Sequence, residues 1–304
     1  MPTTIPGPSS DIDIMMVGHF AKDRLVVDGV SEVASGGAVY YGSIALRQLG
    51  LDVAVVTRAH PDDFPLLADL EQAGVEVFVT PAPATSGIEN IYDSADMERR
   101  VCRLMAFAGA FQQEEIPERS ARVYLVTPII AGEVDVSLLK FLASRGPVGL
   151  DVQGFVRVPE NVNDGGELVF RQWPDMAEGL SHVTYLKVDR AEAELLTGEV
   201  DLYVAARKLA AYGPSEVVIT QSSGVTVYAD DHIYEAPFTP RSLAGRTGRG
   251  DTCFATYVGK RLNSSPQEAA RFAAAVTTLK QEKPGPWRGP VDDVGKVLEG
   301  RRPA

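Results

Sequence analysis

Cysteine and histidine are scarce in this chain of 304 residues. The two cysteines, Cys102 and Cys253, lie far apart, so no disulfide framework is expected and a reducing compartment is the default. The four histidines have no metal-ligand spacing, which argues against a zinc site. The chain is long enough to bury a sizeable core without such cross-links.

Signals for secretion or membrane insertion are missing as well. The first residues, MPTTIPGPSSDID, lack the basic and apolar regions of a signal peptide, and no apolar run approaches the length of a membrane span. The 29 Lys and Arg are outnumbered by 41 Asp and Glu, and the net charge of −12 disfavours nucleic acid and anionic membranes as partners. We therefore expect a cytoplasmic protein, with a disordered tail at residues 1–10.

Strand patterns alternate with amphipathic helical patterns along most of the chain. Strands are expected at 12–17, 53–57, 75–79, 123–127, 148–152, 183–187, 216–220 and 226–229, and helices at 38–49, 62–73, 136–144, 190–196, 202–211, 251–262 and 266–282. This alternation implies βαβ units and therefore an α/β fold with a doubly wound, mostly parallel sheet. We expect one domain over residues 11–304, with ligands at the carboxyl ends of its strands.

Two segments, at about 23–35 and 86–104, break this rhythm with hairpin-like patterns. The first contains Asp28-Gly29, a dipeptide that tight hairpin turns prefer. Neither segment fits a crossover unit of the main sheet. We expect the two hairpins to pair into a small β lid over the site; the alternative is two unrelated surface hairpins.

The most informative motif is GRTGRGDTCF at residues 245–254, which runs directly into a predicted helix starting at about Asp251. Gly248 and Gly250 flank Arg249, and glycines at a helix N-terminus let backbone N–H groups approach an anion closely. An aspartate would repel a bound phosphate, but it could accept a proton from an attacking hydroxyl beside those donors. The alternative is that Asp251 merely caps the helix. The motif is neither a Walker A loop nor a dinucleotide-binding fingerprint.

Together, the glycine pair Gly36-Gly37 at an early helix start and this later motif resemble the two signature regions of PfkB carbohydrate kinases. The resemblance extends from Met16 to about Pro286. It implies a ribokinase-like fold and an ATP-dependent kinase that uses Mg²⁺ and phosphorylates a hydroxyl of a small polyol or sugar. It leaves open a monovalent-cation requirement and a homodimer formed through the lid.

The resemblance also implies roles for particular residues around the reacting groups. Asp251 matches the catalytic base, and Gly248, Arg249 and Gly250 match the loop that holds the transferred phosphoryl group. On the substrate side, Asp23 matches the acid that binds acceptor hydroxyls, and Gly36 and Gly37 match the glycine pair beneath the acceptor.

Nucleotide and metal roles are implied for a second group of residues. Asp189 and Glu192 match a motif that organises magnesium through water, and Lys187 lies in the strand that leads to it. Thr220 and Gly224 match the border of the nucleotide phosphates and ribose. The run 273–280 and Gly285 match the wall of the adenine pocket.

Four residues depart from the family pattern, one of which is Ser222 in place of a glycine. Arg249 replaces a small residue in the phosphoryl-binding loop, where it either contacts phosphate or points to solvent. Asp189 replaces an asparagine, and its alternative role is the N-cap of a helix at 190–197. Tyr41 stands where the family often has a substrate-binding asparagine, so the acceptor cannot be taken over from ribokinase.

The acceptor is suggested by the segment VGLDVQGFVR, residues 148–157, which leaves a strand at its carboxyl end. Its polar side chains, including Gln153 and Arg157, suit a polyol that needs several hydroxyl partners. The segment resembles the inositol kinase branch of the family. A nucleoside kinase is the alternative, with Tyr40, Tyr41, Phe107 or Phe155 as a shelf for a base, and a non-catalytic sugar- or nucleotide-binding regulatory member is another.

Overall fold

A computed structural model describes residues 12–93, 96–160 and 166–301, so the predicted tail at 1–10 lies outside the described residues. Their largest element is a nine-stranded sheet. From one edge to the other its strands are β15 (His232–Pro237), β14 (Gly224–Ala229), β13 (Glu216–Thr220), β12 (Tyr185–Asp189), β9 (Val148–Asp151), β8 (Ala121–Val126), β1 (Ile12–Val17), β4 (Val53–Ala59) and β5 (Glu76–Pro81). All neighbours pair in parallel except β13 with β14 and β14 with β15.

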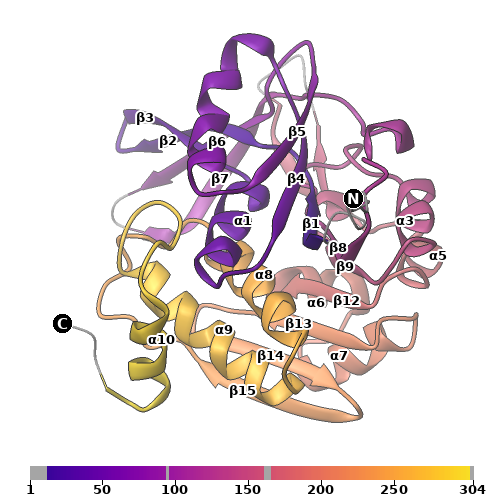
Figure 1. The fold of residues 1–304 in the computed structure, drawn as a ribbon, viewed down its shortest axis with the longest axis vertical. Helices are drawn as coiled ribbons and strands as arrows, with labels where there is room; N and C mark the ends of the chain where they lie inside the picture. The colour runs from indigo at the N-terminus through magenta and orange to yellow at the C-terminus, as the bar shows by residue number, and fades with distance from the viewer. Residues whose placement is uncertain (1–11, 94–95, 161–165, 302–304) are drawn as a thin grey trace, which may run out of the picture.

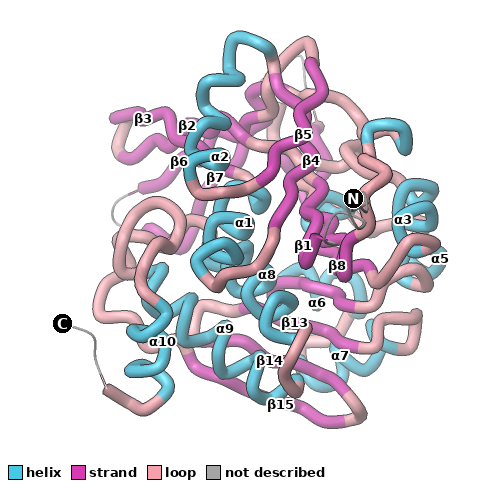
Figure 2. The backbone as a smooth tube through the Cα atoms, in the orientation of Figure 1, coloured by secondary structure: helices cyan, strands magenta, loops and turns pink. Residues whose placement is uncertain are grey.

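Helices cover both faces of this sheet (Figures 1 and 2). One layer is formed by α1 (Ala38–Gln48), α8 (Arg249–Arg261) and α9 (Pro266–Gln281), and the other by α3 (Val136–Ala143), α5 (Met176–Leu180), α6 (Arg190–Thr197) and α7 (Leu202–Ala210). Strand residues alternate between the two cores: Ile14 and Met16 of β1 pack with the first layer, and Met15 and Val17 with the second. The predicted doubly wound α/β class is confirmed.

Several boundaries and elements differ from the sequence prediction. The helix expected at 62–73 is a 3₁₀ helix, η1 (Pro61–Leu67), followed by a short α2 (Ala68–Gln72), because Pro65 inside it cannot support regular α-helical bonding. The prediction also missed β15 and three short helices of the described residues, α4 (Gln153–Val156), α5 and α10 (Val291–Leu298). None of the helices in the described ranges has both the length and the apolar character needed to span a bilayer.

The two predicted hairpins pair with each other. The first consists of β2 (Ala21–Val27) and β3 (Val30–Gly36), and the second of β6 (Gly87–Asp93) and β7 (Asp96–Ala106). β2 and β6 run in parallel and join them into a four-stranded sheet, so the alternative of two unrelated hairpins is wrong. Asp28 and Gly29 have positive φ values of 49° and 82°, as a tight hairpin turn requires.

A third, unpredicted hairpin borders this small sheet. It is formed by β10 (Arg157–Pro159) and β11 (Leu168–Phe170), and the Leu104 N–H of β7 donates to the Gly166 carbonyl at 2.7 Å.

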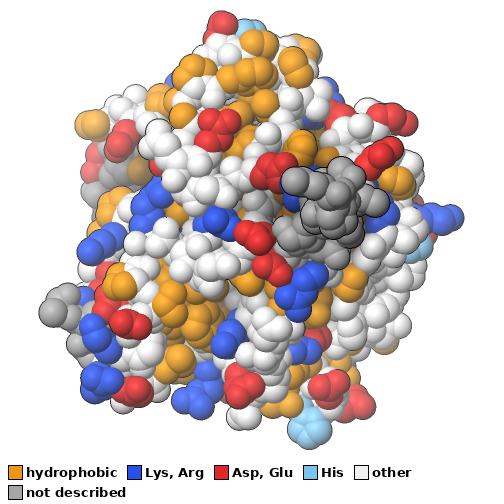
Figure 3. Space-filling view, viewed as in Figure 1, with side chains coloured by type: hydrophobic (Ala, Val, Ile, Leu, Met, Phe, Trp, Pro, Cys, Tyr) orange, Lys and Arg blue, Asp and Glu red, His pale blue; other side chains and the backbone are white. Residues whose placement is uncertain are grey.

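Between α9 and α10, an apolar surface area lined by Phe272 and Leu298 lies among interspersed charges (Figure 3).

The connections between the large and small sheets meet at one buried carboxylate, Glu133. The backbone N–H of His19, between β1 and β2, donates to it at 2.6 Å, and that of Ile129, after β8, at 2.8 Å. The His19 ring lies 2.7 Å from the Ser86 hydroxyl at the start of the second hairpin, and this hydroxyl also accepts the Ala108 N–H at its end. Glu133 thereby holds together the connecting segments that position the small sheet over the large one.

Replacing Glu133 with alanine is expected to destabilise the fold. Two buried N–H groups would lose their acceptor, at about 1–3 kcal/mol each, so the free energy of unfolding should fall by about 2–6 kcal/mol in urea denaturation. Glu114→Ala, at an exposed position, is the control and should leave stability unchanged. Equal stability of the two variants would show that Glu133 does not anchor the crossings.

Candidate active site

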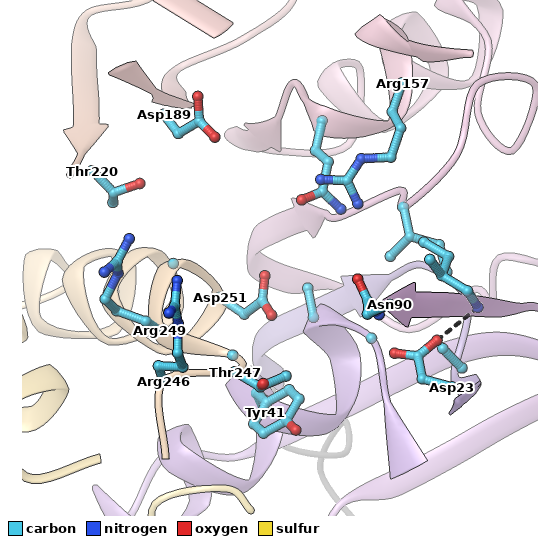
Figure 4. Close-up of a pocket in the computed structure, with 18 of the residues that line it drawn as sticks. Asp23, Tyr41, Asn90, Arg157, Asp189, Thr220, Arg246, Thr247, Arg249 and Asp251 are labelled. Atoms are coloured by element: carbon cyan, nitrogen blue, oxygen red, sulfur yellow. Dashed lines mark hydrogen bonds between the residues drawn. The ribbon is translucent and has the colours of Figure 1, made fainter. Parts of the chain in front are cut away.

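A cavity of ≈ 330 Å³ opens at the carboxyl ends of the central strands, between the small sheet and the start of α8. Its lining comes from segments far apart in the chain: Ala21, Asp23, Gly37, Ala38, Tyr41, Ile88, Asn90, Ile129, Gln153, Arg157, Lys187, Asp189, Thr220 and residues 246–251. In Figure 4, Asp251 lies between Arg246 and Arg249 on one side and Asp23, Asn90 and Arg157 on the other. The cavity therefore has two ends of different chemistry on either side of one carboxylate.

The start of α8 is shaped by two glycines. Gly248 is the N-cap residue with φ of 79°, and a Cβ there would lie 2.4 Å from the Tyr41 ring, so no other residue fits without rearrangement. The helix begins at Arg249, and Asp251 lies in its first turn. The interpretation of Asp251 as a helix cap is wrong, because Gly248 holds that position and no side chain caps this end.

Gly250 has a different reason to be glycine. A Cβ there would approach nothing closer than 3.6 Å, at the Lys187 side chain, so the protein itself leaves room for a methyl group. The first N–H groups of a helix have no acceptor within it. At Gly250 these N–H groups face the cavity. Because glycine has no side chain, an anion can approach them closely.

Asp251 is half-buried, and its surroundings control its charge. Burial raises the pKa of Asp251 above its ordinary value, and the nearby Asp151 carboxylate raises it further. Three cations, Lys187, Arg157 and Lys280, oppose this shift. A carboxylate with a raised pKa is a better proton acceptor than an ordinary surface aspartate.

A buried ion cluster supports the floor of the cavity. Lys187 lies 3.0 Å from Asp151 and 3.7 Å from Glu192. Burial alone would lower the pKa of Lys187, but these two carboxylates and others nearby raise it above its ordinary value. Asp189 and Glu192 form the capping box of α6, with backbone-to-carboxylate distances of 2.8 and 2.7 Å. Asp189 is therefore the helix N-cap and a cavity residue at once.

The opposite end of the cavity is polar and lies under the small sheet. The Asp23 carboxylate accepts the Ile88 N–H at 2.9 Å across the β2–β6 junction (Figure 4). A Cβ on Gly36 would lie 2.3 Å from the other Asp23 oxygen, so this glycine makes room for the carboxylate. Asn90 reaches the same end from β6, and Arg157 reaches it from the start of β10.

A model of the pfkB family carbohydrate kinases matches residues 32–291. The chain belongs to this family.

Among solved structures, a sulfate complex of a pyrophosphate-dependent kinase in the ribokinase family is 38% identical, with a TM-score of 0.85 over 90% of this chain and 97% of that one. A pyrophosphate-dependent kinase in the ribokinase family complexed with a pyrophosphate analog and myo-inositol is 37% identical, with a TM-score of 0.84 over the same shares. A cytidine kinase of Thermococcus kodakarensis is 27% identical over 91% of this chain and 98% of the relative.

The cavity of this pfkB-family kinase collects most of the residues singled out from the sequence. Those in its lining are Asp23, Gly37, Gln153, Arg157, Lys187, Asp189, Thr220, Gly248, Arg249, Gly250 and Asp251. Gly36, Glu192, Gly224 and Gly285 are not in the lining. Gly36 makes room for the Asp23 carboxylate, and Gly224 allows the close approach of β15, since its Cβ would lie 2.5 Å from the Ala236 carbonyl.

Sequence reasoning missed Asn90 and Arg246 as cavity residues. Arg246 lies inside the recognised motif, where a second arginine close to Arg249 was a usable signal for an anion. Asn90 gave no such signal, because it enters the cavity only through the parallel pairing of β2 with β6.

Metal binding by protein groups alone has no support in the parts of the chain that the structure describes. No cluster of three or more His, Cys, Asp or Glu side chains able to hold a metal ion is found there. Asp189 does line the cavity, and the Glu192 Oε1 atom is buried without a hydrogen-bond partner. These two carboxylates fit an ion that keeps its water shell.

Gly250→Ala is expected to lower activity strongly without unfolding the kinase. The methyl group has room in the fold and suits the helix, but it projects toward Lys187 and Thr220, into the space for an anion. Phosphoryl transfer should fall about a hundredfold or more, the scale of losing an oxyanion donor, while the melting temperature stays the same or rises.

The matched control is Gly295→Ala in α10, where a Cβ meets nothing within 4 Å. This variant should keep both stability and activity. Full activity in Gly250→Ala would show that the reacting phosphate does not bind at the start of α8.

Proposed function

We propose that this kinase transfers a phosphoryl group from inorganic pyrophosphate to a hydroxyl of a polyol, with myo-inositol as the first acceptor to test. The observation that carries the proposal is the position of Asp251 between a cationic end and a polar, hydroxyl-binding end of one cavity. A base at that position reaches the hydroxyl of one substrate and the terminal phosphate of the other.

The lining of the cationic end favours pyrophosphate over ATP, the donor implied by the family resemblance. Its side chains are Lys187, Asp189, Thr220, Arg246 and Arg249, a set that binds phosphate and offers no apolar surface to a purine. The residues expected to form the adenine wall, 273–280 and Gly285, do not line this cavity. Two solved relatives at 37% and 38% identity are described as pyrophosphate-dependent, which supports the same choice.

The opposite end favours a polyol over a nucleoside. Asp23, Asn90, Gln153 and Arg157 provide donors and acceptors for several hydroxyls at once. Of the four aromatic residues considered as a shelf for a base, only Tyr41 lines the cavity, and its ring packs against Gly248. A myo-inositol complex of one relative supports the polyol assignment.

The reaction follows from this arrangement. The acceptor hydroxyl loses its proton to Asp251 as its oxygen forms a bond to the terminal phosphorus, and the bond from that phosphorus to the bridging oxygen breaks in line. Inorganic phosphate leaves, and the Asp251 proton returns to solvent or to the product. Backbone N–H groups at Gly250 and Asp251, together with Arg249, stabilise the charge on the phosphoryl oxygens. Asp189 and Glu192 would hold a Mg²⁺ ion through water, and such an ion would neutralise part of the donor charge.

Asp251→Asn should remove the base while leaving the shape of the site intact. We expect kcat to fall about a hundred- to ten-thousandfold with both substrates still bound, measured by phosphate release and by calorimetry. Because burial raises the pKa of Asp251, wild-type activity should fall as the pH drops, at a higher pH than for an ordinary aspartate, as the base becomes protonated.

Asp292→Asn, at an exposed position in α10, is the control and should behave like wild type. A fully active Asp251→Asn variant would remove Asp251 from the reaction.

Arg249→Met should weaken donor binding selectively. The loss of one charge-assisted hydrogen bond is worth about 1.5–3 kcal/mol, so KM for pyrophosphate should rise about ten- to a hundredfold while KM for the acceptor stays constant. Arg271→Met, an exposed position on α9, controls for the loss of one positive charge.

The same assay compares pyrophosphate with ATP in the wild type across inositols, pentoses, hexoses and nucleosides, with products identified by ³¹P NMR. Turnover with ATP alone would overturn the donor assignment, and turnover with nucleosides alone would overturn the acceptor assignment.

A further inference from the structure

Lys280 of α9 is a lysine inside the protein, immediately behind the phosphoryl-binding loop at residues 245–250. Its side chain is 1% exposed. The ammonium donates to the Gly245 carbonyl at 2.6 Å and lies 5.0 Å from the centre of the Tyr41 ring. Within residues 12–93, 96–160 and 166–301, no carboxylate forms an ion pair with it. A buried cation with only a carbonyl and a ring as partners is costly unless another negative charge compensates it.

Both contacts lead to the loop that faces the cavity. Gly245 opens that loop and lies so close to the end of α9 and the residues after it that its Cβ would be 1.8 Å from the Lys283 carbonyl. The Gly245 N–H also donates to the Gln281 carbonyl at 2.8 Å. Tyr41, the second partner of the ammonium, packs against Gly248 at the other end of the loop. The ammonium of Lys280 thus holds the start of the loop directly and its end through the Tyr41 ring.

The positive charge of Lys280 is only partly compensated by the groups that surround it. Tyr41 from α1 and Asp251 from α8 are the titratable groups that face it. Burial lowers the pKa of Lys280 to about 8, and the Asp251 carboxylate only partly offsets this. An anionic donor in the adjoining cavity adds the negative charge that favours the ammonium form.

We propose that Lys280 is a positioning residue for phosphoryl transfer, whose ammonium fixes the loop 245–250 from behind and is charge-balanced when the phosphate donor binds. The proposal rests on the donor site proposed above. Lys280 does not line the cavity, so it acts through Gly245, Tyr41 and the field at Asp251 rather than by touching the substrates. A cation built into the fold at this point also helps an acidic chain of net charge −12 to bind an anion.

Two substitutions separate the hydrogen bond from the charge. Lys280→Gln can still donate to the Gly245 carbonyl but is neutral, and Lys280→Met loses both. We expect kcat/KM for the donor to fall about ten- to a hundredfold in Lys280→Gln and further in Lys280→Met, with KM for the acceptor unchanged. Lys140→Met, an exposed lysine of α3 on the other face of the sheet, is the control and should match wild type.

The pH profile gives a readout that a purely structural role would not move. As the pH rises through about 8, the ammonium of the free enzyme loses its proton, so wild-type kcat/KM for the donor should fall. This alkaline limb should be absent in Lys280→Gln. In the wild-type pH profile of kcat, the alkaline limb should lie at a higher pH than in the profile of kcat/KM, because the bound donor favours the ammonium form.

The proposal is overturned if Lys280→Gln keeps the wild-type kcat/KM and alkaline limb. If the variants unfold, as thermal melting would reveal, the wild-type profile decides: no alkaline limb near pH 8 overturns the proposal. All assays use whichever donor the wild type accepts. A failure of pyrophosphate as donor therefore appears in the wild type, whereas a failure of the Lys280 proposal appears only in the variants and the pH profile.

Discussion

The cavity depends on one close approach: the N-terminus of α8 lies against Tyr41 of α1 and faces the carboxyl ends of β12 and β13. Gly248 permits it, because its left-handed conformation and missing side chain let the Tyr41 ring pack directly on the turn. The approach brings the first turn of the helix, the Asp251 carboxylate and Lys187 to a single cavity. A bulkier residue at position 248 would move all of these groups together.

The charge around the cavity differs from the net charge of the chain. The chain carries a net charge of −12, yet arginine and lysine collect where an anion would bind, and carboxylates line or border the same cavity. Within this mixture, burial raises the pKa of the proposed base Asp251, and three cations oppose this rise. Lys187 is buried beside the cavity, and its ion pair with Asp151 stabilises the lysine cation at that position.

Much of the fold and part of the site follow from the sequence. Alternating strand and helix patterns predict the doubly wound sheet, Asp28-Gly29 predicts the first hairpin turn, and the glycine motif predicts the start of α8. What escaped prediction depends on contacts between distant segments. Asn90 reaches the cavity only because β2 pairs with β6, and Glu133 gathers the crossings to the small sheet from a loop without a motif. The burial of Lys280 likewise could not be read from an ordinary helical pattern.

The most direct measurement is a crystal structure with myo-inositol and a non-hydrolysable pyrophosphate analogue bound together. The two-ended cavity predicts the analogue against Gly250, Arg246 and Arg249, and the inositol between Asp23 and Arg157. One inositol hydroxyl should lie within hydrogen-bond distance of Asp251 and in line with the terminal phosphorus. An analogue bound elsewhere, or an inositol with no hydroxyl directed at Asp251, would contradict the assignment of the two ends and of the base between them.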